Sequence, residues 1–436
     1  MGRLRRLALP ALLAACGEVS SAPDGGPAPP DAGAAAALSV TVGHVFGEPL
    51  PTEGLTVLVV APDGRLIETT TDGDGTARAE GVVAGSTLLV FLRAAPSGAP
   101  EGRLTLAVVG VEPGDALVFA DPSPPVDSLG TMTVDFPDRA GAASYRVENG
   151  CTAAFPTEST TSLEFTGACV DAGAVAILIR AADDGGGLLG WIGGSGRFAA
   201  GGLLEIAGAW SDPEDLAVDL VNVPAEPQSA AGRMNPIVAD QEFDGTMRSP
   251  LALDGQDVQL RLSAPSAYVD SRAVAIDLTP ASADLGPQTL VHRVPAAQDT
   301  LELSLVDELL PWYGAGQAAL GARALRWTRS SGREPDAQLV SATWIEDGEV
   351  IENGLFVLAP PDVTEVELPA LPAEHAEYAP IAPSAIDVAV IGAESSRFDS
   401  YRQARQRGFE IAGDRDILAG GEASQQRLSG SPNAEL

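Results

Sequence analysis

The 436-residue chain has few residues of the types that carry chemistry: three histidines, three cysteines, no lysine, and only 5% aromatic residues. The histidines are far apart in the sequence, at His44, His292 and His375. None has the Glu three residues later that a carboxypeptidase-type zinc motif needs, and His-Glu-x-x-His does not occur. The residues at those three places are Gly47, Pro295 and Tyr378. The sequence therefore lacks the motifs of the common zinc peptidases.

Positive charge is also scarce. The chain has 26 basic residues against 60 acidic ones, which gives a formal net charge of −34. Such a surface repels the phosphate backbone of nucleic acids, so we expect no nucleic-acid partner. The closest approach to a nucleophile elbow, Gly193-Gly194-Ser195-Gly196-Arg197, has Arg where the last Gly belongs, and it is typical of a glycine-rich hairpin. No phosphate-binding fingerprint follows a strand, so we expect no cofactor and no enzyme activity.

Long apolar runs are absent. The run at 7–15 (LALPALLAA) is far shorter than the roughly 20 residues of a membrane-spanning helix. It follows a basic cluster of Arg3, Arg5 and Arg6 and ends in small residues. A basic start, an apolar middle and a small-residue end predict a signal peptide at 1–15.

The end of this segment, Leu13-Ala14-Ala15-Cys16, is followed by Gly17 and resembles the lipobox of bacterial lipoproteins. The resemblance implies that Cys16 is acylated and becomes the first residue of the mature chain. In that family Gly, rather than Asp, after the cysteine implies the outer membrane. The alternative is an export signal that ends in cysteine by chance. Residues 16–37 are rich in Pro, Gly, Ser and Ala, which predicts a disordered tether between the anchor and the folded body.

The other two cysteines are Cys151 and Cys169. An even pair in an exported chain predicts a disulfide, because the compartment is oxidising. No histidine lies near either cysteine, which disfavours a metal site there.

The body reads as tandem β-sandwiches, an all-β fold. In the first unit, 38–122, short strands at 38–42, 55–60, 65–70, 76–80 and 86–92 alternate with glycine turns. The order of its motifs resembles the carboxypeptidase regulatory-like (transthyretin-like, carbohydrate-binding-like) domain. The motifs are Val42-Gly43-His44-Val45, Leu55-Thr56-Val57, Thr71-Asp72-Gly73-Asp74-Gly75 and Val83-Ala84-Gly85-Ser86. The last motif lacks the usual Pro and Tyr. The resemblance implies a non-catalytic structural or binding module.

A second sandwich is predicted at 126–224 and a third β-rich unit at 225–395. Trp191 and Trp210 are expected to fill the core of the second unit, and the acidic stretch 212–219 to form a solvated turn. His292 alternates within a strand and is expected to face solvent. The remainder, 396–436, is predicted to hold one short helix at 400–408 and a fraying tail.

Two further sites are weaker candidates. Asp72 and Asp74 resemble part of a calcium loop, but the third acid and the terminal Glu of an EF-hand are missing. Trp312-Tyr313 is the best candidate for a sugar-binding platform, although a packed turn is favoured. The leading hypothesis is thus a non-enzymatic envelope lipoprotein that binds a protein partner or acts as an adhesin or scaffold. The alternative is a carbohydrate-binding surface lipoprotein.

Overall fold

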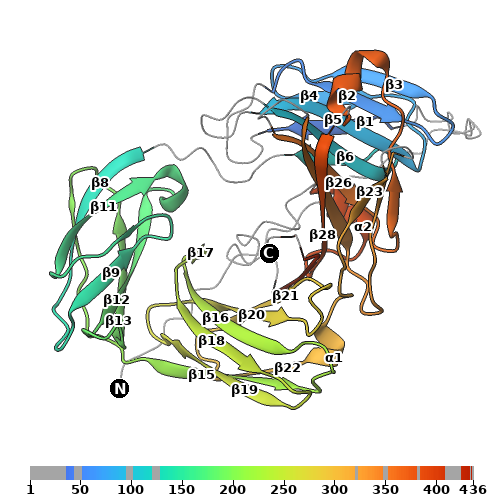
Figure 1. Cartoon of the computed structure of the whole chain (residues 1–436). Coiled ribbons are helices and arrows are strands. Elements are labelled where there is room, and N and C mark those ends of the chain that lie inside the picture. Colours follow the sequence, from blue (N-terminus) through green and yellow to red (C-terminus); the bar gives the residue numbers. More distant parts are fainter. Residues whose placement is uncertain are drawn as a thin grey trace, which may run out of the picture. The chain divides into compact units, whose positions relative to one another are not determined.

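The computed structural model describes residues 36–43, 52–94, 102–119, 128–319, 323–346, 352–380, 383–407, 424–432 and 434. Strands in several sheets dominate and helices are short, which confirms the all-β prediction (Figure 1). The signal segment 1–15, Cys16, most of the tether and His44 lie outside the described residues. Within those ranges no helix combines the length and apolarity that crossing a bilayer requires.

The first unit consists of seven strands in two layers. One layer has the order β4-β1-β7, with β1 (Leu38–Val42), β4 (Thr76–Ala79) and β7 (Ala116–Phe119). The other contains β2 (Thr56–Val60), β3 (Leu66–Thr70), β5 (Ser86–Ala94) and β6 (Gly102–Val111). Every second residue of β1 is buried, because successive side chains of a strand point to opposite faces. One apolar core fills the space between the layers.

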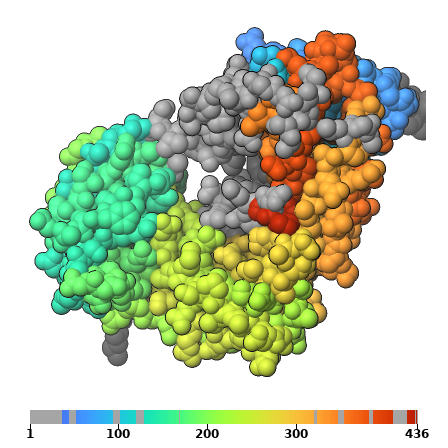
Figure 2. All heavy atoms as spheres, viewed as in Figure 1, coloured from blue at the N-terminus to red at the C-terminus, as the bar shows by residue number. Residues whose placement is uncertain are grey.

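The second layer continues into the C-terminal half of the chain. β6 pairs in parallel with β26 (Glu352–Ala359), and one thirteen-stranded sheet results. Its order is β17-β16-β20-β21-β29-β28-β25-β26-β6-β5-β2-β3, and β18 pairs with β16. The other members are β16 (Ser229–Val238), β17 (Gln241–Glu242), β18 (Thr246–Ala252), β20 (Ser271–Thr279), β21 (Gln288–Pro295), β25 (Ala337–Glu346), β28 (Pro383–Ser395) and β29 (Gln425–Gly430). In Figure 2 the blue first unit accordingly lies against the orange C-terminal strands.

Both faces of this sheet are covered where β2 to β6 meet β25 to β28. Val57 and Val59 point into the first core, whereas Leu58 between them points into a second core on the opposite face. That second core is covered by a small sheet of β23 (Gln317–Ala319), β24 (Ala324–Arg326) and β27 (Glu365–Glu367). Burial on both faces explains why β2 has a continuous apolar run instead of an alternating one.

The second unit forms a separate sandwich with its own core. Its sheets have the orders β10-β9-β12-β13 and β11-β8-β14. The strands are β8 (Ser128–Asp135), β9 (Ser144–Glu148), β10 (Ala153–Ala154), β11 (Thr160–Thr166), β12 (Ala174–Ala182), β13 (Leu188–Arg197) and β14 (Leu203–Glu205). Cys151 and Cys169 are joined by a disulfide with their Cα atoms 5.8 Å apart, as predicted.

The glycine-rich segment in this unit is one strand of a β-hairpin formed by β12 and β13, in agreement with the predicted glycine-rich hairpin. Gly193, Gly194 and Gly196 lie within β13, which pairs along its length with β12. A Cβ on Gly196 would lie 2.4 Å from Leu204, and one on Gly193 would lie 2.9 Å from Tyr268. Glycine is required there because neighbouring side chains occupy the space.

Trp191 also departs from the prediction. It is fully buried, but it packs in a small cluster with Phe243 and Leu178 instead of the main core of the second unit. Trp210 does pack against that main core and is half-buried. The indole of Trp191 therefore helps to join the second unit to the segment after β16.

The acidic stretch 212–219 is also a strand for most of its length. β15 (Glu214–Val221) pairs with β19 (Val258–Ala264) and with β22 (Thr300–Ser304). Leu216, Val218 and Leu220 are fully buried in the core of this third sandwich. Asp215 and Asp219 occupy alternate positions of β15 and are exposed or partly exposed. β15 precedes the expected unit boundary at 224, whereas its partners β19 and β22 follow that boundary.

The tail expected to fray instead supplies a central strand. β29 lies between β21 and β28 and pairs antiparallel with both. Arg427 and Ser429 of this strand are buried, and they form an ion pair and a hydrogen bond inside the structure. The predicted short helix is present as α2 (Tyr401–Gln406), with Ser400 as its N-cap. The buried pair Arg405–Asp115 (2.7 Å) holds α2 against the first unit.

Candidate functional site

The two aspartates proposed for calcium form a backbone-capped turn. One carboxylate oxygen of Asp72 accepts hydrogen bonds from the amides of Asp74 (3.1 Å) and Thr76 (2.9 Å). Gly75 provides the positive φ of 71° that the turn needs. Asp183 makes the same pair of bonds in the second unit. The geometry thus gives Asp72 a turn-forming role that requires no ion.

The aromatic pair proposed for sugar binding is in the interior. Trp312 is 5% exposed in the third core, and Tyr313 is fully buried against the large sheet. The two rings therefore pack as a turn and offer no open platform.

His292 is buried, contrary to the expectation that it faces solvent. It lies on β21, where its Nε2 atom is 3.7 Å from Glu308 at the end of α1 (Leu305–Glu308). Burial lowers the pKa of His292 to about 4, and the charge of Arg427 contributes in the same direction. The imidazole is therefore neutral at pH 7.

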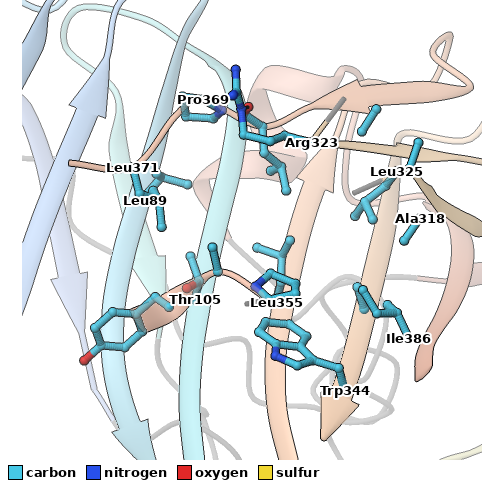
Figure 3. Close-up of a pocket in the computed structure, with 17 residues that line it drawn as sticks. Leu89, Thr105, Ala318, Arg323, Leu325, Trp344, Leu355, Pro369, Leu371 and Ile386 are labelled. Atoms are coloured by element: carbon cyan, nitrogen blue, oxygen red, sulfur yellow. Dashed lines mark hydrogen bonds between the residues drawn. The ribbon is translucent and has the colours of Figure 1, made fainter. Parts of the chain in front are cut away.

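An apolar hollow of about 130 Å³ lies over the second core of the large sheet. One wall consists of side chains from β5, β6, β25, β26 and β28, and the opposite wall comes from β23, β24 and the segment after β27 (Figure 3). Its apolar lining includes Leu89, Leu325, Trp344, Leu355, Leu371 and Ile386. We refer to this feature as the apolar hollow.

Two polar groups accompany this lining. Thr105 is 4% exposed, and its hydroxyl has no hydrogen-bond partner among the described residues. Arg323 is exposed, and its Nε atom donates to the carbonyl of Leu368 (3.2 Å). The indole nitrogen of Trp344 is already used, since it donates to Glu346 (2.9 Å). The apolar hollow thus offers one unused hydroxyl and one cation beside an apolar lining.

A second group of side chains lies beside the apolar hollow. Glu68 on β3 and Glu374 and His375 on the 3₁₀ helix η4 (Ala373–Tyr378) have ligand atoms within 4.8 Å of one another. We refer to these three residues as the Glu–His cluster. The same helix contributes Tyr378 to the lining of the apolar hollow.

A buried charge network crosses the large sheet near β29. The guanidinium of Arg427 contacts Glu394 (2.9 Å) and, through Nε, Glu308 (2.8 Å). Glu394 also accepts from Arg333. These groups are paired with one another and leave no open coordination site, so we assign the network to the cohesion of the sheet.

Sequence reasoning did not identify the apolar hollow or the Glu–His cluster. The zinc-peptidase motif places Glu three residues after the His, whereas the carboxylate neighbours of His375 are the preceding residue and a residue on β3. The adjacent Glu374-His375 pair was the one available signal, and nothing in the sequence connects it to Glu68, about 300 positions earlier.

Comparison with known proteins gives only distant similarity. No protein-family model matches the chain, and no curated protein matches its sequence. Among solved structures, the Bacillus anthracis TIE protein is 10% identical over 62% of this chain and 50% of its own, with a TM-score of 0.15. A Ca²⁺-stabilized adhesin with which an Antarctic bacterium binds ice is 12% identical (80% and 88% covered, TM-score 0.12), and a streptococcal ancillary pilin is 9% identical (62% and 98%, TM-score 0.17). The chain is therefore weakly similar to bacterial surface proteins, and likeness at this level leaves its function to be argued from its own residues.

Proposed function

We propose that this chain is a non-enzymatic, lipid-anchored protein of the bacterial cell envelope, attached at the outer membrane, that binds a partner protein through the apolar hollow. The observation that carries the binding role is the hollow itself, which combines an apolar lining with the unused hydroxyl of Thr105. Ligand sites in proteins have this composition, with a predominantly apolar wall and a few polar groups that set orientation.

The size of the apolar hollow limits what can enter it. Its volume of about 130 Å³ is close to that of an engineered cavity of roughly 150 Å³ that takes up benzene. One aromatic ring or one branched aliphatic side chain fits such a space. Arg323 at the surface would pair with an acidic residue beside that side chain. The expected partner segment therefore presents an apolar anchor next to an acid.

The anchor follows from the lipobox resemblance at Cys16. Replacing it (Cys16→Ser) should release the chain from the membrane fraction, because a diacylated terminus is the proposed attachment. Mass spectrometry of the native amino terminus should find acyl chains on Cys16. Membrane association that persists in the Cys16→Ser variant would contradict the anchor without affecting the hollow.

The hollow is tested by photo-crosslinking in intact cells, with a photoreactive residue placed at position 323. We expect a discrete crosslinked product that disappears when Ala318→Phe fills the hollow from β23. The exposed Ala174→Phe on β12 introduces the same side chain in the second unit and should leave the product unchanged. A product that survives Ala318→Phe, or the absence of any discrete product, would refute binding through the hollow.

Carbohydrate binding is the alternative function. Trp312 and Tyr313, the expected sugar-binding platform, are buried, and a glycan array on the mature chain tests carbohydrate binding directly.

A further inference from the structure

We propose that the Glu–His cluster binds a divalent first-row transition metal ion, with Zn²⁺ as the probe ion. Glu68, Glu374 and His375 supply one imidazole nitrogen and two carboxylates, a donor set that zinc accepts. This proposal does not depend on what the apolar hollow binds.

The spacing of the donor atoms fits a zinc ion. The Nε2 atom of His375 lies 3.6 Å from a carboxylate oxygen of Glu68. Two ligands at about 2.0–2.1 Å from a tetrahedral zinc ion are about 3.3 Å apart, so a shift of a few tenths of an ångström brings His375 and Glu68 to that spacing. Glu374 is exposed, and its carboxylate can rotate to provide the third ligand. Three protein ligands leave a fourth position for water.

The imidazole of His375 is largely buried, and its Nε2 atom has no hydrogen-bond partner among the described residues. The side chain of His375 is 12% exposed, and its buried Nε2 atom makes no hydrogen bond within the described part of the chain. A buried nitrogen without a hydrogen bond is costly unless a further partner satisfies it. A metal ion between Nε2 and Glu68 would satisfy both groups.

The surroundings hold this ligand in place. The ring of His375 stacks on Phe91 of β5, with centroids 4.8 Å apart and an interplanar angle of 21°. Glu377, two residues further along η4, forms ion pairs with Arg93 (3.0 Å) and Arg103 (3.3 Å) and so holds η4 against β5 and β6. A ligand fixed by packing loses little freedom on binding, which favours affinity.

A plain ion pair between His375 and Glu68 is the alternative explanation of the 3.6 Å contact. That pair needs a protonated imidazole and does not involve Glu374. A metal site, by contrast, requires all three residues and a neutral imidazole. The two explanations therefore differ in the effect of changing Glu374.

A bound ion would also tie β3 of the first unit to η4. Because Tyr378 at the end of η4 and the following Ala379 and Pro380 line the apolar hollow, the ion would stabilise that wall. Any ligand that binds only the folded state raises the melting temperature.

The test is titration of the full mature chain with Zn²⁺ at pH 7.5, followed by calorimetry and by the melting temperature. We expect saturable 1:1 binding that raises the melting temperature. Glu374→Gln, on an exposed side chain, and His375→Phe, which keeps a ring on Phe91, should each weaken zinc binding by about tenfold or more, since even outer partners of metal ligands are worth roughly 10–100-fold. The matched control Asp74→Asn, in the other acidic candidate, should bind zinc as the unmodified chain does.

Three results would overturn the proposal. The first is the absence of saturable zinc binding. The second is an unchanged affinity in Glu374→Gln, which would leave only the ion pair. The third is loss of binding in Asp74→Asn, which would place the ion in the turn of the first unit. Ca²⁺ is included as a second probe ion and should not compete, because it prefers oxygen ligands.

Discussion

Arg427 on β29 offers a demanding test of how the large sheet is held together. Its side chain is 5% exposed and lies between two carboxylates, Glu394 (2.9 Å) and Glu308 (2.8 Å from Nε). Arg427→Met preserves most of the apolar stem and removes only the charge and its hydrogen bonds. The variant is therefore expected to unfold more readily for an electrostatic reason.

The size of the stability loss depends on which charged partners Glu394 and Glu308 keep in the Arg427→Met variant. Glu394 keeps Arg333 as a partner (2.7 Å). Among the described residues, Glu308 keeps His292, at 3.7 Å, which is neutral at pH 7 because burial lowers its pKa to about 4. Removing one partner of a buried pair costs about 3–5 kcal/mol. We expect Arg427→Met to lower the free energy of unfolding by that amount at pH 7.

The assay is urea denaturation followed by tryptophan fluorescence, with Arg326→Met as the control. Arg326 pairs with Glu365 at a similar distance (2.7 Å), but both side chains are about half exposed. Solvent and salt screen an exposed pair, so the control should change stability little. The comparison isolates burial, because the substitution and the type of ion pair are the same.

The pH dependence provides a second criterion. Without the charge of Arg427, His292 loses a cause of its low pKa and keeps the one that raises it, Glu308. The imidazole should therefore take up a proton as the pH falls and replace part of the missing charge. The cost of Arg427→Met should be smaller at pH 5.5 than at pH 8. A cost no larger than that of Arg326→Met, or one independent of pH, would refute this account of the network.

Two further perturbations follow from the second unit. The double variant Cys151→Ser, Cys169→Ser should lose about 3 kcal/mol of stability in denaturant unfolding, since the disulfide closes a short loop (sequence separation 18); an unchanged midpoint would show that the loop is constrained without it. Burial raises the pKa of Glu148 to about 7 although Arg146 acts against it. Between the ordinary Glu pKa of about 4.3 and pH 7, the carboxyl group of Glu148 therefore keeps a proton in the folded state that it has lost in the unfolded state. The stability from this group is thus present in acid and is lost as the pH rises to about 7; Glu148→Gln should gain stability relative to the unmodified chain between pH 5 and 8, and a constant difference would contradict the assignment.

The sequence alone determined the fold class and most individual strands. Alternation predicted β1 at 38–42 with its exact bounds, and the predicted segments at 55–60, 65–70 and 86–92 lie on β2, β3 and β5. The disulfide was also predictable, because the signal-peptide pattern predicted export and left Cys151 and Cys169 as an even pair. These features depend on local periodicity and composition, which a single segment carries within itself.

The sequence did not predict the strands β13 and β29, whose residues are explained by contacts with distant parts of the chain. Gly193 and Gly196 weaken any local strand signal, and only the approach of Tyr268 and Leu204 explains why glycine stands there. β29 is polar, and it becomes a central strand because Glu308 and Glu394 neutralise Arg427 inside the sheet. Local propensity contains neither fact.

The apolar hollow and the Glu–His cluster are formed only by the tertiary structure. The apolar hollow exists because β6 pairs with β26 and so brings Leu89 and Trp344 to one wall. The Glu–His cluster exists because η4 packs on β5 and places His375 beside Glu68. Such contacts join residues hundreds of positions apart. The periodicity of a segment decides whether it forms a strand, but the pairing of strands across the chain decides which side chains meet.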